Sequence, residues 1–181
     1  YKANPNTVVV LVAGSSLAIN WIDQNIPAVL DAWYPGEQGG TAVAEALFGD
    51  YNPGGRLPLT FYNSLSDLPA FDDYNVRNNR TYMYFEGKPL YPFGYGLSYT
   101  DFAYRGLDIA QDEENVTVKF FVSNTGNYDG DEVAQVYIQF PDQGTILPLK
   151  QLKGFKRVHI SKGQETEITV RIPKKELRLW S

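Results

Sequence analysis

Cysteine is absent from the 181 residues of the sequence, and histidine occurs once, as His159. The missing thiols exclude disulfides, thiolate metal sites and a cysteine nucleophile. A single histidine excludes a metal site built from several histidines. We therefore expect neither a metal nor a cofactor.

Basic runs and long apolar runs are also absent. The net charge of −5 argues against nucleic-acid binding. The longest apolar run covers residues 7–13, far short of the ~20 residues that span a bilayer. We therefore expect no nucleic-acid partner and no membrane partner. The first residues do not match a signal peptide, so either a signal was removed or the sequence is an internal piece.

The two halves of the sequence differ in composition. Residues 1–100 hold 8 of the 11 prolines and 10 of the 16 glycines, whereas residues 101–181 alternate between apolar and polar positions. We therefore predict two domains, 1–100 and 101–181. Aromatic residues make up 14% of the chain, which fits either a large aromatic core or contacts with sugar rings.

The first half has the order expected of a parallel α/β domain. The continuous β-branched run at 7–13 and the apolar stretch at 26–33 predict strands that are buried on both faces. A helix should follow Gly39 and Gly40, with Thr41 as its N-cap and Gly49 at its end. Its apolar face should comprise Val43, Ala44, Leu47 and Phe48. Residues 56–61 could add a short edge strand. So few βα units indicate the tail of a larger α/β domain.

The second half predicts an antiparallel β-sandwich, because apolar residues recur at every second position around 116–122, 134–140 and 168–172. We expect four or five strands, whereas a complete sandwich of this type has about seven. The fold class is thus a partial parallel α/β sandwich followed by an immunoglobulin-like or fibronectin III-like β-sandwich that is missing its last strands.

Acidic residues offer few catalytic candidates. Glu37 follows a predicted strand, at the end where open α/β sheets bind ligands. Three pairs of neighbouring acids, at 72–73, 113–114 and 131–132, are best explained as solvated loop acids. We expect His159 on a strand at the surface of the sandwich.

Several stretches resemble glycoside hydrolase family 3. Residues 32–40 read Ala-Trp-Tyr-Pro-Gly-Glu-Gln-Gly-Gly, and residues 80–100 read Arg-Thr-Tyr-Met-Tyr-Phe-Glu-Gly-Lys-Pro-Leu-Tyr-Pro-Phe-Gly-Tyr-Gly-Leu-Ser-Tyr-Thr. Stretches 4–13 and 46–61 add to this resemblance. Stretches 122–126, 130–137 and 152–158 resemble the fibronectin type III-like domain that these enzymes carry.

The resemblance implies a retaining, exo-acting β-glycosidase that removes terminal non-reducing sugars from plant oligosaccharides. Family members take their nucleophile from a barrel and their acid/base from a segment upstream of residues 4–13. Neither has a counterpart in this sequence, so we predict no catalytic residue and an inactive fragment. The candidates for substrate contact are Glu37, Arg80, Tyr82 and Tyr84. The residues around 80–90 resemble the β-xylosidase branch, but β-glucosidases remain an alternative.

Two further expectations concern the role and location of the chain. A carbohydrate-binding module, or an adhesion or assembly module without catalysis, is the alternative function. Apolar surface around residues 62–100 would favour association, including a homodimer. A bacterial enzyme of this type would be secreted or periplasmic.

Overall fold

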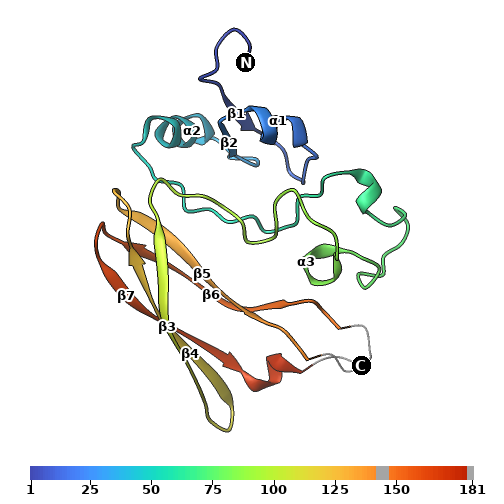
Figure 1. The fold of residues 1–181 in the computed structure, drawn as a ribbon, viewed down its shortest axis with the longest axis vertical. Helices are drawn as coiled ribbons and strands as arrows, with labels where there is room; N and C mark the ends of the chain where they lie inside the picture. Colours follow the sequence, from blue (N-terminus) through green and yellow to red (C-terminus); the bar gives the residue numbers. More distant parts are fainter. Residues whose placement is uncertain (142–146, 179–181) are drawn as a thin grey trace. The chain divides into compact units, whose positions relative to one another are not determined.

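The computed structural model describes residues 1–141 and 147–178, and an α/β part precedes an all-β part (Figure 1). The elements of the first part are β1 (Val8–Leu11), α1 (Asn20–Asn25), β2 (Ala28–Asp31), α2 (Gly39–Phe48), η1 (Leu65–Asp67) and α3 (Thr81–Tyr84). Those of the second part are β3 (Phe102–Gln111), β4 (Asn115–Asn124), β5 (Gly130–Ile138), β6 (Gln151–Ile160), β7 (Glu165–Pro173) and η2 (Lys174–Leu177). The predicted fold class is confirmed.

The chain divides into two compact units whose boundaries are not a single point in the sequence. Unit 1 comprises Tyr1–Tyr51 and Leu57–Tyr95, and unit 2 comprises Asn52–Arg56 and Gly96–Ser181. Residues 52–56 and 96–100, which lie in the predicted first half, therefore belong to the all-β unit.

The parallel sheet of unit 1 is formed by β1 and β2, which pair from Val8 opposite Ala28 to Leu11 opposite Asp31. Both strands lie in the predicted apolar stretches, and α1 connects them. Because α1 links two parallel strands, the segment is one βαβ crossover. The sequence predicts the parallel strands but not the helix between them. Across residues 1–141 and 147–178, the structure has no helix long and apolar enough to cross a membrane.

Helix α2 starts earlier than predicted and buries a different face. Its N-cap is Gln38, not Thr41, and Gly49 ends it in the left-handed conformation at φ 84°. A Cβ on Gly39 would lie 2.5 Å from Pro35, so a glycine is needed where the helix starts. The buried residues are Gly39 and Ala46, which lie two turns apart on one face. The predicted apolar face is wrong: Phe48, for example, is 85% exposed.

Residues 56–61 do not form the predicted edge strand. Phe61 makes an isolated antiparallel bridge with Tyr91, and the amide of Leu57 donates to the carbonyl of Tyr95 at 2.8 Å. Pro58 lies between these two contacts and has no amide hydrogen, so the ladder does not continue.

Unit 2 contains an antiparallel sheet of order β3–β4–β7 and an antiparallel pair β5–β6. The inward residues of the strands alternate as predicted and form one buried core. Its members are Val118, Phe120, Val122, Ala134, Ile160, Ile168, Val170 and Ile172. This apolar core fixes which face of each strand points inward, because a shift of one residue would expose the whole set.

Candidate functional site

The carboxyl end of β2 carries a half-buried carboxylate, that of Asp31. The backbone amide of Trp33 donates to Oδ1 of Asp31 at 3.3 Å, while Oδ2 is buried without a hydrogen-bond partner among the described residues. Burial raises the pKa of Asp31, and the Trp33 amide offsets only part of that effect. Trp33 adopts a left-handed backbone at φ 52°, which is uncommon for a bulky residue. Strained residues of this kind concentrate at functional sites.

Glu37 lies on the exposed turn just before α2. It follows Asp31, the last residue of β2, by six residues. Figure 1 draws α2, which follows Glu37, well apart from α3, which follows Arg80. Glu37 thus precedes α2, whereas Arg80 precedes α3 and both Tyr82 and Tyr84 lie on α3.

Arg80 is held between two strained residues. Asn79 has φ 57° and Thr81 has φ 60°, and both belong to the left-handed region. The Nη2 group of Arg80 donates to the carbonyl of Ala70 at 2.9 Å, whereas its Nε is buried and has no hydrogen-bond partner in the described structure. A buried guanidinium nitrogen without an acceptor is unfavourable, so this N–H is available to an added acceptor.

The tyrosines of α3 belong to an aromatic assembly. The Tyr82 ring stacks on Phe93 with centroids 4.2 Å apart and planes at 17°. A second stack joins Tyr91 and Tyr95, with centroids 5.2 Å apart. One face of each of these rings is therefore covered by another ring, as in an aromatic core. Tyr84 is half-buried on the same short helix.

Glu132, which the sequence suggested as a solvated loop acid, is a buried strand residue. It forms an ion pair with Arg56, and the two side chains are only 10% and 12% exposed, respectively. The hydroxyl of Tyr104 donates to Oε1 of Glu132 at 2.6 Å. Burial raises the pKa of Tyr104, and the hydrogen bond to Glu132 adds to this effect. The interpretation as a solvated acid is wrong because a base 76 positions away neutralises the carboxylate.

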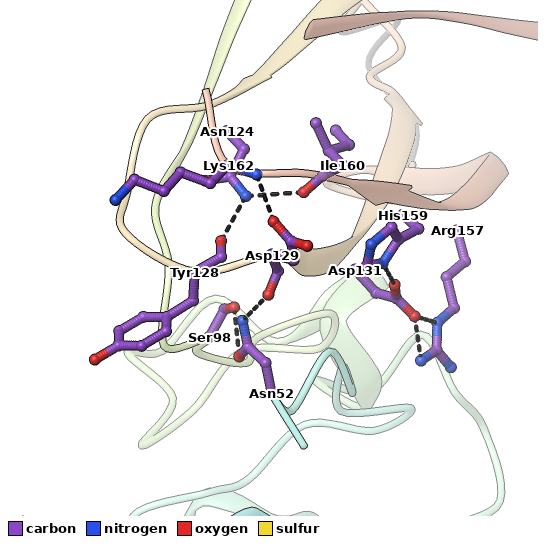
Figure 2. Close-up of polar contacts among 10 residues, drawn as sticks. All are labelled: Asn52, Ser98, Asn124, Tyr128, Asp129, Asp131, Arg157, His159, Ile160 and Lys162. Atoms are coloured by element: carbon purple, nitrogen blue, oxygen red, sulfur yellow. Dashed lines mark hydrogen bonds and ion pairs between the residues drawn. The ribbon is translucent and has the colours of Figure 1, made fainter. Parts of the chain in front are cut away.

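Asp131, the neighbour of Glu132 on β5, is paired on the other side of the strand (Figure 2). Its Oδ2 accepts from Nε of Arg157 at 2.8 Å, and its Oδ1 lies 2.8 Å from Nδ1 of His159. Burial tends to raise the pKa of Asp131, but hydrogen bonds to His159 and Arg157 and the charge of Arg157 together outweigh it, so the pKa lies below its usual value. His159 lies on β6 with an exposed side chain, as predicted.

Asn52 and Asn124 organise the polar loops of unit 2 (Figure 2). Asn52 donates from Nδ2 to the carbonyl of Asp129 at 2.9 Å and accepts at Oδ1 from the Ser98 hydroxyl at 2.9 Å. Asn124 donates from Nδ2 to the carbonyls of Tyr128 and Ile160, both at 2.8 Å. These side chains satisfy backbone groups that strand pairing leaves open.

These contacts limit the chemistry of the described acids. Asp131 and Glu132 point to opposite faces of β5, and each is occupied by cationic or hydroxyl partners. Residues 1–141 and 147–178 contain no group of three His, Asp or Glu side chains that could hold a metal ion. Sequence reasoning missed Arg56 and Tyr104, whose partners are remote in the chain; the turn at 52–55 was the only local signal near them.

Comparisons with known proteins match both parts of the chain. Residues 1–99 match the model of the glycosyl hydrolase family 3 C-terminal domain, and residues 132–181 match the fibronectin type III-like domain. The chain is 42% identical to a xylan 1,4-beta-xylosidase of Xylanibacter ruminicola, over 98% of this chain and 21% of the relative. It is 38% identical to a periplasmic beta-glucosidase of Salmonella typhimurium, over 96% of this chain and 25% of the relative.

Solved structures agree with these relationships. A beta-D-glucoside glucohydrolase from Trichoderma reesei superposes with a TM-score of 0.92 at 29% identity, covering 99% of this chain and 30% of that one. Beta-glucosidase 3B from Thermotoga neapolitana superposes with a TM-score of 0.87 at 35% identity, covering 94% of this chain and 26% of that one. The chain spans between a fifth and a third of the length of these proteins. It belongs to glycoside hydrolase family 3.

Proposed function

We propose that this chain works as the C-terminal part of a retaining exo-β-glycosidase, which removes terminal β-xylosyl or β-glucosyl units from plant oligosaccharides. The observation that carries the proposal is sequence identity along almost the whole chain to a xylosidase and to a glucosidase. Because the relatives are named for two sugars, the proposal includes both.

The chain alone should be inert, and its role is to support the catalytic part. The acids of unit 2 support this view, because Glu132 is bound by Arg56 and Tyr104, and Asp131 by Arg157 and His159. These two carboxylates do not form the facing pair that glycoside hydrolysis needs, because neighbours on a strand point to opposite faces.

The test is an assay of the purified chain on aryl β-xylosides and aryl β-glucosides. We expect no turnover from the chain alone. Co-expression with the preceding part of the Xylanibacter xylosidase should yield activity that this preceding part lacks by itself. Turnover by the chain alone, surviving repeated purification and absent from a mock preparation, would contradict the inert role.

Arg80 is the sequence-predicted contact residue that the geometry favours most. Its buried Nε–H lacks an acceptor in the described structure, and a sugar hydroxyl could supply one. Glu37, Tyr82 and Tyr84 remain proposed contacts with weaker support. In the co-expressed enzyme, Arg80→Met should raise KM more than it lowers kcat. The exposed neighbour Arg77 provides the control, since Arg77→Met should leave both constants unchanged.

A carbohydrate-binding role is the second candidate. Phe71 and Tyr74 are 94% and 84% exposed, so both rings present open faces that suit a sugar ring. Calorimetric titration with xylo- and cello-oligosaccharides should give heat that disappears in the Phe71→Ala/Tyr74→Ala variant. Phe48→Ala, which removes another exposed ring, is the control. Absence of binding heat at millimolar oligosaccharide would contradict the carbohydrate-binding role.

We also propose export and self-association for the protein. A relative named as periplasmic supports a periplasmic or extracellular location. Exposed Leu65, Phe71 and Tyr74 on one segment of unit 1 support association, including a homodimer. Cell fractionation tests the location, and light scattering across a dilution series tests the dimer.

A further inference from the structure

Residues 52–56 lie within the first half of the sequence but belong to unit 2. We call this segment the strap. Its flanking residues, Tyr51 and Leu57, both belong to unit 1, so the chain leaves unit 1 and returns to it within five residues.

The first end of the strap is anchored by the amide of Asn52. Nδ2 donates to the carbonyl of Asp129 at 2.9 Å. Oδ1 accepts from the Ser98 hydroxyl at 2.9 Å and from the backbone amide of Tyr99 at 2.8 Å. One side chain thus joins two separate loops of unit 2, the one before β3 and the one before β5.

The middle of the strap lies very close to the backbone of unit 2 at two points, Asp131 and Gly96. A Cβ on the buried Gly54 would lie 3.0 Å from both the Cβ and the carbonyl oxygen of Asp131. A Cβ on Gly96 would lie 2.1 Å from the carbonyl oxygen of Gly55. Contacts this short require glycine at position 54 of the strap and at position 96 opposite Gly55, whereas a Cβ on Gly55 itself would meet nothing within 4 Å.

The last residue of the strap places a cation in a buried acidic site. Arg56 pairs with Glu132, whose second oxygen accepts from the Tyr104 hydroxyl at 2.6 Å. The two charged side chains are 12% and 10% exposed, so the loss of Arg56 would leave a nearly buried carboxylate without its counter-charge. Unit 2 therefore carries an acceptor site that only a correctly placed cation satisfies.

From these three anchors, we infer that unit 2 contains a binding site for the strap, and that this intrachain ligand is an integral part of the β-sandwich. The site recognises the amide of Asn52, the backbone at Gly54, where there is no room for a side chain, and the guanidinium of Arg56. The strap should open when unit 2 unfolds and stay docked when only unit 1 opens.

Native-state hydrogen exchange on the full chain tests the inference. The ladder between β4 and β7 reports on unit 2, and the ladder between β1 and β2 reports on unit 1. Arg56→Met should speed exchange in the β4–β7 ladder by roughly tenfold or more, because it leaves Glu132 buried and unpaired. Exchange in the β1–β2 ladder should not change.

The matched control is Arg105→Met, which breaks the exposed ion pair with Glu165 in the same unit. Arg105→Met should change the exchange rates in the β4–β7 ladder by less than about threefold, as expected when a solvent-exposed ion pair is lost. The double variant Arg56→Met/Glu132→Met should recover most of the lost protection, because neither charge is then left buried.

A second variant covers the case in which Arg56→Met fails to fold. Asn52→Ala removes the three hydrogen bonds of the first anchor without stranding a charge, and it should speed exchange in the β4–β7 ladder by at least about threefold. The inference is overturned if strap variants leave the β4–β7 ladder unchanged, or if they speed the β1–β2 ladder as much as the β4–β7 ladder.

Discussion

Arg56 and Glu132 lie 76 positions apart in the sequence and form a nearly buried ion pair. Arg56 comes from a segment framed on both sides by unit 1, and Glu132 from β5, which pairs with β6 in unit 2. The hydroxyl of Tyr104 on β3 completes the contacts of the carboxylate, so three distant parts of the chain meet at one charge.

Removal of the Tyr104 hydroxyl should weaken unit 2. Tyr104→Phe keeps the ring, which stacks on Phe120, but deletes the donor to Glu132. Hydrogen bonds to charged groups contribute about 1.5–3 kcal/mol, so we expect a loss in this range in the free energy of unfolding. Urea denaturation measures it. Tyr128→Phe is the control, because Tyr128 is exposed; an equal loss in both variants would contradict the role of the hydroxyl.

A methyl group at position 96 should be poorly tolerated. Gly96→Ala places a Cβ 2.1 Å from the carbonyl oxygen of Gly55, a distance that forces the strap to move. Overpacking of this kind costs about 1–3 kcal/mol. The control is Gly40→Ala in α2, where nothing lies within 4 Å and alanine favours the helix. Thermal unfolding of the two variants should therefore shift in opposite directions, or at least differ clearly in Tm.

Replacement of Asn124 by aspartate, which has nearly the same shape, should destabilise the fold. Its Nδ2 donates to two carbonyl oxygens, and a carboxylate at this position would face both of them with an acceptor (Figure 2). Asn124→Asp should therefore lower the free energy of unfolding by roughly 2 kcal/mol or more at neutral pH.

Burial would raise the pKa of this new acid, so part of the loss should return as the pH falls and the carboxyl becomes neutral. Urea denaturation at about pH 7 and about pH 5 measures the loss in the free energy of unfolding and shows whether that loss becomes smaller at the lower pH. A variant as stable as the original chain at both values would show that these carbonyls do not need the amide.

The contacts of Asp131 with Arg157 and His159 should make the free energy of unfolding depend on pH in the acid range. The pKa of Asp131 is lowered in the folded protein, so its contribution is present above the unfolded value of about 3.9 and is lost as the pH falls through the folded value. Asp131→Asn should cost about 0.5–1 kcal/mol at pH 7, since its partners are largely exposed.

The difference between Asp131→Asn and the original chain should shrink at about pH 3. Urea denaturation at the two pH values measures this change, and a carboxyl titration by NMR measures the pKa of Asp131 directly. A difference that stays constant from pH 7 to pH 3 would show that the carboxylate charge does not stabilise the fold.

Strand alternation was the most informative sequence signal. The inward residues Val118, Phe120 and Val122 of β4 are buried as their period of two predicts, because burial of one sheet face is a local property of the pattern. The β-branched run at 7–13 likewise predicted a strand where β1 lies, whereas helix α1 was not predicted.

Contacts between remote residues could not be predicted in the same way. Asp131 and Glu132 looked like solvated acids because the pattern around them does not reveal Arg56 or Arg157 as partners. The start of α2 was also misplaced: Gln38 caps the helix without a side-chain hydrogen bond, so no capping side chain marks the true start in the sequence. Arg80 was singled out by sequence, but its unpaired Nε is visible only in the structure.

The strap gives the chain three peptide links between its units, at 51–52, 56–57 and 95–96. A chimera of two family members joined near residue 100 would therefore inherit residue 56 from one parent and residue 132 from the other. If the parents differ at either position, the chimera would leave one of the two nearly buried charges without its partner. This would happen even though the junction itself lies in neither strand nor helix. Recombination of such enzymes should exchange the five residues together with the sandwich that holds them.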